Sequence, residues 1–444
     1  MEAFFRYSSI IVKIEYILCW IMFMIYLYIK YKRRRYIFSI FNINTLIIPL
    51  VVTFLLIGPF QYSDEAWYAL GISDSFWFIE FLDKAYIINM SGFIVFLCCN
   101  LLFEFKSVNN KFEFNIIKIS NSISSSVILV LDILIILLWY ILVISKSGTL
   151  PIFGDRLFAT KSGVQTIYNI LNTLISMFGI YYFIKFIQNN KKIYFFLGII
   201  NIITLFFTAN RGPVIFMALT VVIFYLYYKI DDLKKVNIII IISMIILLFI
   251  GIGMEFIRKG IENINLIETL DSILYGNTFS DLRDGAFILY GYDAKYDDFL
   301  YGKTYIADIL SFLPKSKIEF RQIWSYGLFT TTTLFGWTNH YGLRGGLFLE
   351  AYFNFGYIGV FISAIVLSYI TSNLEIWMYS GVIKKSIKRD LSFEFIITDF
   401  IKNFSLAIMI TSGISKRYPE IIIIICLILI SAPIIKNKNI KNNN

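Results

Sequence analysis

Histidine and cysteine are scarce in this sequence, and the few that occur are poorly placed for metal binding. The single histidine is His340, and one histidine without nearby cysteines cannot supply the ligand set of a zinc or copper site. All four cysteines lie inside apolar runs, so we interpret them as core or lipid-facing thiols and expect no disulfide. They are Cys19, Cys98, Cys99 and Cys426. From this pattern we expect no metal site and no cofactor.

Charged residues are also few, at 16% of the chain, and the familiar catalytic motifs are missing. There is no Walker loop, no His-Glu-x-x-His and no Gly-x-Ser-x-Gly, so an ATPase, a zinc protease and a serine hydrolase have no support. The net charge is +10, but the basic residues lie mainly in short loops between apolar runs. Such loops orient membrane helices, and we therefore predict no binding to nucleic acid.

Long apolar runs dominate the sequence, which is 58% hydrophobic. A helix that spans a bilayer needs about 20 apolar residues. Runs of this kind predict an all-α integral membrane protein, a polytopic bundle of about 11 transmembrane helices (10–12). The predicted spans are Ser9–Ile29, Ile40–Phe60, Ala85–Phe105, Ser126–Ser145, Thr166–Ile187, Ile193–Phe207, Pro213–Tyr228, Val236–Met254, Gly346–Ile370, Phe393–Ile410 and Ile421–Ile435.

The basic loops give these spans one alternating orientation. Residues 32–35 are all basic and follow the first span, which predicts a cytoplasmic loop there and an N-terminus outside. The first apolar run has no cleavage-like site of small residues, so we interpret it as a retained helix. The loop 61–84 is mostly acidic, as expected outside, and we expect its segment 75–82 to lie along the membrane interface.

One connection is far longer than the others and separates the predicted helices into two groups. Residues 1–254 hold spans one to eight, residues 346–436 hold spans nine to eleven, and residues 437–444 form a cytoplasmic tail. Residues 255–345 form the long loop, which is nearly neutral and rich in aromatic residues. Loops of this length are usually functional or disordered. The aromatic content favours a folded cap on the outer face of the membrane.

Arginine is expected inside, yet one occurs in nearly every segment predicted to lie outside. One explanation is snorkelling to the lipid head groups or local pairing with aspartates. As a set, the arginines indicate an anionic ligand, because guanidinium groups bind phosphate oxygens with two parallel hydrogen bonds. Arg211 lies in a tight turn before a predicted helix, whose free N–H groups also favour a phosphate. The arginines are Arg156, Arg211, Arg258, Arg283, Arg321, Arg344 and Arg417.

His340 precedes Arg344 by four residues, near the end of the long loop. A lone histidine near an interface can simply be an amphipathic anchor. Its unperturbed pKa near neutrality also suits it to take a proton from a sugar hydroxyl. A helix would place His340 and Arg344 on one face, but Gly342, Gly345 and Gly346 favour a turn instead.

Asp132 is a charged residue within the fourth predicted span. Intramembrane carboxylates are functional candidates by default. Asp132 lies about six residues from the start of its span, and Glu15 lies near the start of span one. A proton or ion relay normally uses several carboxylates at mid-depth, and the sequence does not show such a set.

Four segments together resemble the O-antigen polymerase (Wzy-type) family of bacterial oligosaccharide repeat-unit polymerases. They are GTLPIFGDR at 148–156, TANRGP at 208–213, GNTFSDLRDG at 276–285, and NHYGLRGG followed by LEAYFNFGYIGVF within 339–361. The resemblance covers roughly residues 146–370 and includes the plan of many spans with one large outer loop. Family members are often drawn with twelve spans and cytoplasmic ends, which differs from the eleven predicted spans.

The resemblance implies a function on the outer face of the cytoplasmic membrane of a bacterium. The family transfers a growing glycan from undecaprenyl pyrophosphate to a hydroxyl of a newly flipped lipid-linked repeat unit, without a metal or a nucleotide sugar. The product would be O-antigen, or a capsular or exported polysaccharide. The implied partners are this lipid-linked oligosaccharide and membrane lipid. A chain-length regulator and a flippase are candidate protein partners.

The resemblance also assigns roles to individual residues. Arg211 would contact the donor pyrophosphate and His340 would activate the acceptor hydroxyl, so these two are the candidate catalytic residues. Arg283 and Arg344 would help to hold phosphate. We add Arg156, Arg417 and Asp281 as candidate substrate-binding residues. Asn354, Gly356 and Gly359 match an Asn-Phe-Gly-x-x-Gly stretch that we interpret as helix packing through small residues.

Two other functions compete with the polymerase. An O-antigen ligase would use the same site to attach finished glycan to a lipid core. A flippase for lipid-linked oligosaccharide would favour internal repeats, a polar central cavity and short loops on both sides. This sequence instead concentrates its polar residues in one outer loop.

Overall fold

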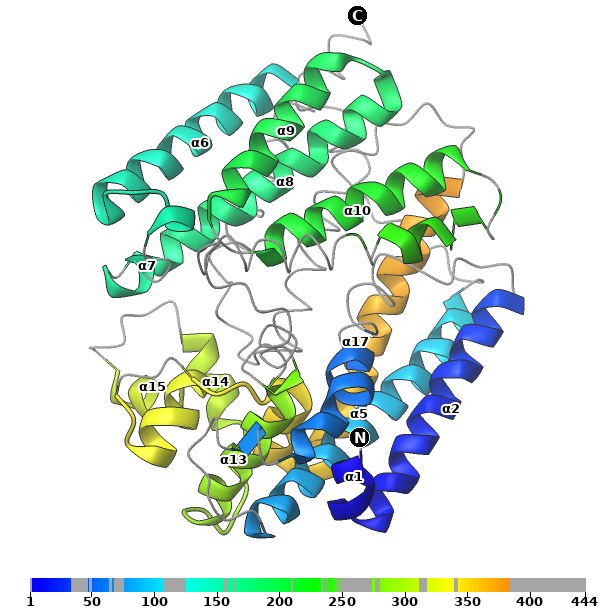
Figure 1. Ribbon diagram of the computed structural model, residues 1–444, viewed down its shortest axis with the longest axis vertical. Helices are drawn as coiled ribbons and strands as arrows, with labels where there is room; N and C mark the ends of the chain where they lie inside the picture. Colours follow the sequence, from blue (N-terminus) through cyan, green and yellow to red (C-terminus); the bar gives the residue numbers. More distant parts are fainter. Residues whose placement is uncertain are drawn as a thin grey trace, which may run out of the picture. The chain divides into compact units, whose positions relative to one another are not determined.

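The structure, a computed structural model, describes residues 2–32, 47, 50–63, 66–67, 76–107, 125–154, 158–162, 164–208, 211–230, 232, 235–236, 238–243, 246, 274–275, 280–310, 318–338 and 342–383. Helices, turns and loops make up these residues, with no strand among them (Figure 1). The chain divides into two compact units. The first takes its described residues from Met1–Lys111 and Asn265–Ile376, and the second takes them mainly from Phe112–Ile264.

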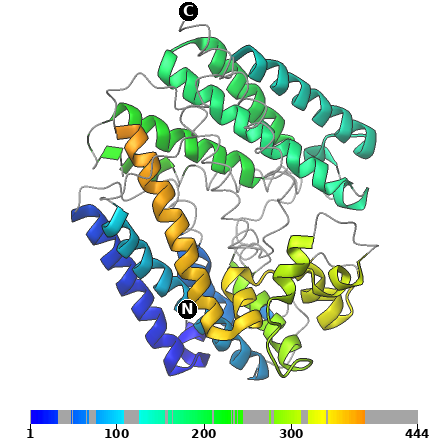
Figure 2. The same cartoon turned by 180° about the vertical axis from the view of Figure 1, so that it is seen from behind.

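Three long helices form the framework of the first unit: α2 (Ile10–Lys32), α5 (Phe76–Ser107) and α17 (Gly346–Ile383). They run side by side in both views (Figures 1 and 2). Polar groups join them at several depths. The Asn100 amide of α5 accepts a hydrogen bond from Tyr26 of α2 and donates one to Thr371 of α17. The Ser368 hydroxyl of α17 donates to the carbonyl of Phe96. Such bonds join membrane helices where apolar contact alone gives little preference.

Helix α5 begins at Phe76, so the prediction of an interfacial segment at 75–82 followed by a span from Ala85 is wrong. Two of the charged residues that suggested a boundary, Asp83 and Lys84, have partners here. Asp83 accepts hydrogen bonds from the Ser9 amide and the Tyr62 hydroxyl, and Lys84 forms a 2.7 Å ion pair with Asp293. Because these charges are paired, the helix continues through them for a further three turns.

Helix α17 bends at Phe355 and Gly356, whose backbone angles are not helical. Gly356 has a φ of 62°, and a Cβ at Gly359 would collide with the carbonyl oxygen of Ala351. Gly356 therefore lies at the kink, and the Phe299 ring packs where a Cβ of this glycine would be. The interpretation that these small residues allow close packing stays a prediction. The Asn354 amide beside the kink donates to Thr304 at 2.7 Å.

Short helices form the described part of the long loop predicted at 255–345. They are α13 (Asp281–Asp293), α14 (Lys303–Ile309), α15 (Glu319–Trp324), α16 (Tyr326–Leu328) and the π-helical turn η9 (Phe329–Thr333). Aromatic rings pack among them, such as the stacked pair Phe287 and Phe335 at 4.5 Å between centroids. Helix α13 packs directly against α5, so this region belongs to the first unit.

The second unit contains α6 (Ser125–Ser147), α8 (Gln165–Asn189), α9 (Lys192–Phe206) and α10 (Arg211–Lys229). Helices α8 and α9 form a hairpin whose turn uses Asn190 in the left-handed conformation, with φ 57°. Gly198 of α9 faces the ring of Phe183, where a larger residue would keep the two helices apart. Helix α8 also contacts α6 and α10, and it is therefore the central helix of this unit.

The remaining described elements are shorter. They are α1 (Glu2–Tyr7), η2 (Val51–Ile57), η3 (Gly58–Tyr62), η5 (Pro151–Phe153) and α7 (Phe158–Lys161).

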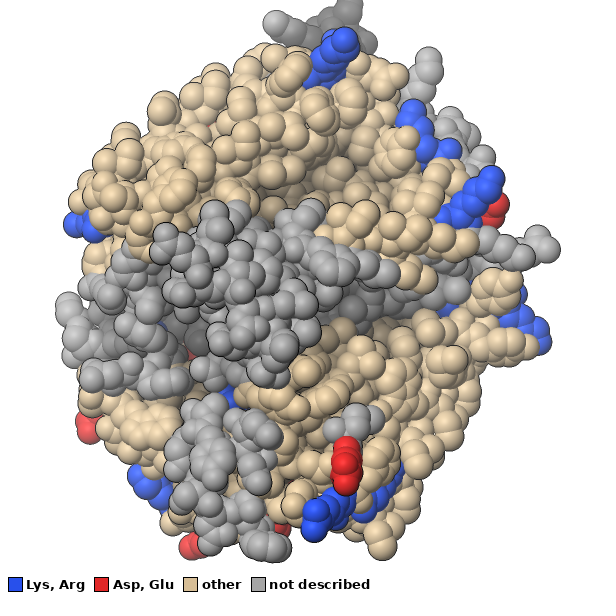
Figure 3. Space-filling view, in the orientation of Figure 1, with Lys and Arg blue, Asp and Glu red and all other residues tan. Residues whose placement is uncertain are grey.

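Among the described residues, five helices are long and apolar enough to cross a membrane: Ile10–Lys32, Trp77–Phe103, Ser126–Phe153, Ile167–Asn189 and Gly346–Asn373. Large apolar side chains project from them; on α6, for instance, Val130, Leu137 and Ile141 are more than half exposed. The described surface in Figure 3 likewise carries few charged side chains. A soluble protein rarely exposes apolar surface on this scale, and the fold is that of a helical, multi-pass membrane protein.

The predicted number of spans is larger than these five. Helix α9 and the apolar part of α10, Pro213–Leu226, match predicted spans six and seven but are shorter than a typical span. Spans ten and eleven lie outside the described residues, as do parts of spans two and eight. Cys19, Cys98 and Cys99 are free thiols, buried or half-buried, and Cys426 lies outside the described residues.

Candidate functional site

A cluster of polar and charged side chains surrounds the first turn of α13. Ser280 precedes this helix, and its hydroxyl donates to Asp284 Oδ2 at 3.0 Å. Asp281 and Asp284 both lie in the first turn, where the helix dipole favours negative charge. Both carboxylates are largely buried, with side chains 9% and 10% exposed. A pair of buried carboxylates needs a cation nearby.

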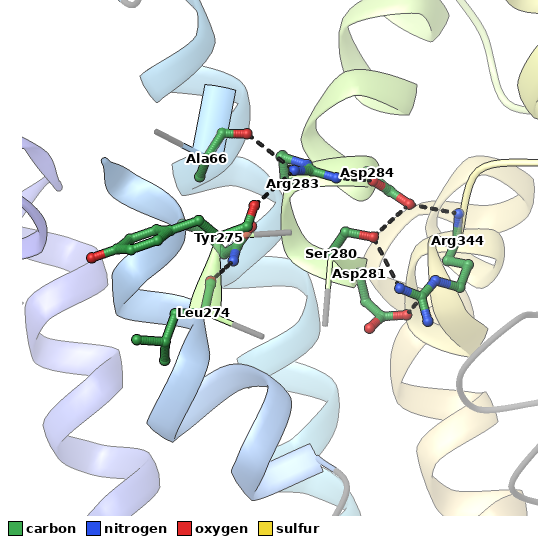
Figure 4. Close-up of polar contacts among 9 residues, drawn as sticks. Ala66, Leu274, Tyr275, Ser280, Asp281, Arg283, Asp284 and Arg344 are labelled. Carbon is green, nitrogen blue, oxygen red and sulfur yellow. Dashed lines mark hydrogen bonds and ion pairs between the residues drawn. The ribbon is translucent and has the colours of Figure 1, made fainter. Parts of the chain in front are cut away.

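Arg344 supplies one cation from the segment just before α17 (Figure 4). Its guanidinium Nη2 donates to the Ser280 hydroxyl at 2.9 Å, and its Nε lies 3.6 Å from Asp281 Oδ1. Its backbone N–H donates to Asp284 Oδ2 at 3.4 Å. The SDLRDG segment (280–285) and the segment that contains Arg344 are therefore neighbours in space, although some sixty residues separate them. The Arg344 side chain is 29% exposed, so an external ligand can reach it.

Arg283 lies in the same segment but has a different environment. Its guanidinium is 1% exposed, and Nη1 donates to the carbonyl oxygens of Ala66 and Tyr275 at 3.0 and 3.1 Å. Nη2 lies 3.5 Å from Asp284 Oδ1. A side chain buried in this way holds the loop backbone in place and is not positioned to meet a substrate. The expectation that Arg283 binds phosphate stays a prediction, and in this structure its Nη1 is bonded to two backbone carbonyls instead.

Asp281 combines burial with a partly exposed arginine neighbour. Burial raises its pKa from 3.8 to about 6, and the positive charge of Arg344 opposes that shift. Its carboxyl therefore changes charge close to neutral pH. A titrating carboxyl next to an accessible guanidinium can bind a phosphate and can orient or deprotonate a hydroxyl.

We predict that Asp281→Asn changes how stability depends on pH. Because the folded pKa is higher than 3.8, the folded protein holds a proton between pH 4 and 6 that the unfolded chain has released. The stability of the wild type should then fall by up to about 3 kcal/mol relative to the variant as pH rises from about 4 to 6, and stay constant above. Thermal unfolding of both proteins in detergent at pH 4, 5, 6 and 7 measures this. A difference that does not change with pH would contradict the assignment.

The other candidate residues belong to the second unit or lie outside the described residues. Arg211 is the first residue of α10, in the second unit, as expected for a residue at a helix N-terminus. His340, Arg156 and Arg417 lie outside the described residues. Residues 342–345 are not helical and Gly342 has a φ of 116°, so the described part of this segment is not the helix that would place His340 and Arg344 on one face.

Sequence reasoning missed several polar residues near this cluster. Ser280 and Asp284 could have been recognised, because serine is common just before a helix and acidic residues are common in its first turn. Glu350 was missed because it lies within an apolar helix, and it is fully buried while accepting a hydrogen bond from Thr304. Tyr326 is also buried, and burial raises its pKa well above 10. Any side chain at position 345 would collide with the Tyr326 hydroxyl, so the segment around Gly345 packs tightly against this tyrosine.

Comparisons of this chain with protein-family models, with characterised proteins and with solved structures gave no match.

Proposed function

We propose that this protein polymerises oligosaccharide repeat units carried on undecaprenyl pyrophosphate, as the family it resembles does. The observation that carries the proposal is the contact between Arg344 and the first turn of α13. The contact joins two of the four segments on which the resemblance rests. It also creates a partly exposed guanidinium beside a carboxyl that titrates near neutral pH. A metal-independent glycosyltransferase with a pyrophosphate leaving group needs groups of these kinds.

The reaction assigns a task to each group. The hydroxyl oxygen of the acceptor sugar attacks the anomeric carbon of the donor glycan and forms the new glycosidic bond. The bond from that carbon to the pyrophosphate oxygen breaks, and undecaprenyl pyrophosphate leaves with the electron pair. His340 takes the proton of the acceptor hydroxyl. Arg344 and Arg211 are assigned to phosphate oxygens, where fixed positive charge stabilises the developing negative charge.

The proposal includes a location and a topology finer than the described helices show. The chain would cross the cytoplasmic membrane of a bacterium about eleven times and act on its outer face. The region 255–345 would form the cap over the site, in contact with the lipid-linked substrate. A chain-length regulator and a flippase are the proposed protein partners.

A glycan ladder on a gel tests the proposal. Cells deleted for this gene would be complemented with wild type, His340→Ala or Arg211→Ala, with insertion in the membrane checked for each protein. We expect both variants to lose the ladder while a single repeat unit is still attached to the carrier or the core. If polymer instead accumulates on the lipid carrier and none is attached to the core, the protein is a ligase. An unchanged ladder in the deleted cells would reject both enzymes and return attention to transport.

A further inference from the structure

A second buried polar cluster lies within the second unit, at the level where α6, α8 and α9 meet. Its members are Asp132 of α6, Tyr182 of α8 and Asn201 of α9, and none is more than 1% exposed. The Asn201 amide nitrogen donates to Asp132 Oδ2 at 3.1 Å and to the Leu197 carbonyl at 3.0 Å. These two bonds fix the orientation of the amide. Asp132 is therefore part of the interior of this unit.

Glycine makes this close approach possible. A Cβ at Gly179, one helical turn before Tyr182, would come within 3.1 Å of the Asn201 Cβ and would collide with Met217 of α10. The small residue lets α9 and α10 pack closely against α8 at the level of the cluster.

Three oxygen atoms of the cluster have no hydrogen-bond partner among the described residues: Asp132 Oδ1, Asn201 Oδ1 and the Tyr182 hydroxyl. The Tyr182 hydroxyl is close enough to interact with the Asp132 carboxylate, yet it makes no hydrogen bond of normal geometry to it. Buried polar atoms are nearly always paired, because leaving one unpaired costs about 1–3 kcal/mol. A carboxylate oxygen of this kind with two further oxygens beside it favours a positively charged guest.

Within the part of the chain that the structure describes, no Lys or Arg forms an ion pair with Asp132. The titratable groups that face the cluster are Tyr182 and Tyr181 from α8 and Tyr194 from α9. Lys185 of α8 lies over the Tyr181 ring, 5.6 Å from its centroid. Apolar side chains complete the shell; they include Ile128, Leu131, Ile135, Met177 and Phe178. An isolated carboxylate in such a shell is strongly unfavourable.

We propose that Asp132, Asn201 and Tyr182 form a binding site for one monovalent cation, either Na⁺ or a proton. One carboxylate supplies a single negative charge, which matches a monovalent guest, whereas divalent ions bind several carboxylates. Na⁺ would be held by the three oxygens that have no partner. A proton would reside on the Asp132 carboxyl, which could then donate a hydrogen bond to a neighbouring oxygen. The site concerns the second unit and does not depend on the proposed transferase function.

Binding of ²²Na⁺ to the purified full-length protein in detergent tests the site directly. The proteins compared are wild type, Asp132→Asn, Tyr182→Phe and the control Tyr168→Phe. Tyr168 is also a buried tyrosine of α8 whose hydroxyl has no hydrogen-bond partner among the described residues, but it lies near Asn172 and not near Asp132. Thermal unfolding from pH 5 to 9, with choline chloride in place of sodium, is measured in parallel.

Each outcome decides the question. Na⁺ is identified if the wild type binds ²²Na⁺ saturably and Asp132→Asn abolishes this binding. Tyr182→Phe should then weaken it at least tenfold, and Tyr168→Phe should leave it unchanged. A sodium concentration ten times the Kd should then also raise the Tm of the wild type by about 3–5 °C, because ligand binding stabilises the folded protein. The guest is a proton if no ²²Na⁺ binds and the Tm of the wild type falls, relative to the Tm of Asp132→Asn, as pH rises. No binding together with a Tm difference that is independent of pH would overturn the proposal. If Asp132→Asn fails to fold, Asp132→Leu, which also removes the titrating carboxyl, takes its place in the binding and pH series.

Discussion

Arg344→Ala should lower the rate of glycan chain extension by about 10²–10³-fold, the usual loss when one electrostatic stabiliser is removed from an active site. The guanidinium of Arg344 is the partly exposed cation of the cluster at α13, and a phosphate of the donor needs such a partner. Its loss also removes the positive charge that opposes the raised pKa of Asp281. The glycan ladder of complemented cells, compared at equal amounts of membrane-inserted protein, measures the effect.

Two variants separate a role in binding phosphate from a general effect of charge. Arg344→Lys keeps the positive charge but loses the planar fork that binds two oxygens, and we expect it to restore only part of the ladder. Lys295→Ala removes an exposed cation of the same region that donates only to the Thr333 carbonyl, and it should leave the ladder unchanged. A full ladder with Arg344→Ala would remove this residue from the mechanism. Equal losses in Lys295→Ala and Arg344→Ala would indicate that net charge alone is sensed.

The helices could be predicted from the sequence wherever a long apolar run stood between clear loops. The predicted span Ser126–Ser145 differs from α6 by one residue at its start and two at its end. The start of α5 was missed because Glu80, Asp83 and Lys84 were counted as a boundary. Two of these charges are paired with residues distant in sequence, such as Asp83 with Tyr62 and Lys84 with Asp293. Pairing of this kind is a property of the tertiary structure, and local hydropathy does not contain it.

The candidate site shows the same limit at the level of single residues. The sequence could indicate that Asp281 and Arg344 matter, because both lie in segments with a recognisable pattern, and the structure brings the two together. It could not distinguish Arg344 from Arg283, since both are arginines in polar loop segments. The two differ in burial, because the Arg344 side chain is 29% exposed and the Arg283 side chain is 1% exposed. Burial depends on how α13 packs against α5 and on the carbonyls of Ala66 and Tyr275.

Arg283→Met should destabilise the protein rather than inactivate it selectively. The substitution would leave the carbonyls of Ala66 and Tyr275 without their donor and Asp284 without its nearest cation. Removing one partner of a buried ion pair costs about 3–5 kcal/mol, because the remaining charge stays buried without compensation. We expect less folded protein in the membrane and a lower Tm in detergent. The protein that does fold should retain activity per molecule.

A double variant and a surface control test the physical reason for this effect. Arg283→Met combined with Asp284→Asn also removes the negative charge, and it should recover part of the lost stability if the uncompensated carboxylate causes the loss. Lys84→Met breaks an ion pair whose side chains are 33% and 38% exposed, and it should cost about 1 kcal/mol or less, because water screens such pairs. If Arg283→Met instead kept normal stability and lost only the glycan ladder, Arg283 would have to leave its buried position to meet the substrate. A purely structural role for this arginine would then be wrong, and its guanidinium would again be a candidate ligand for the donor phosphate.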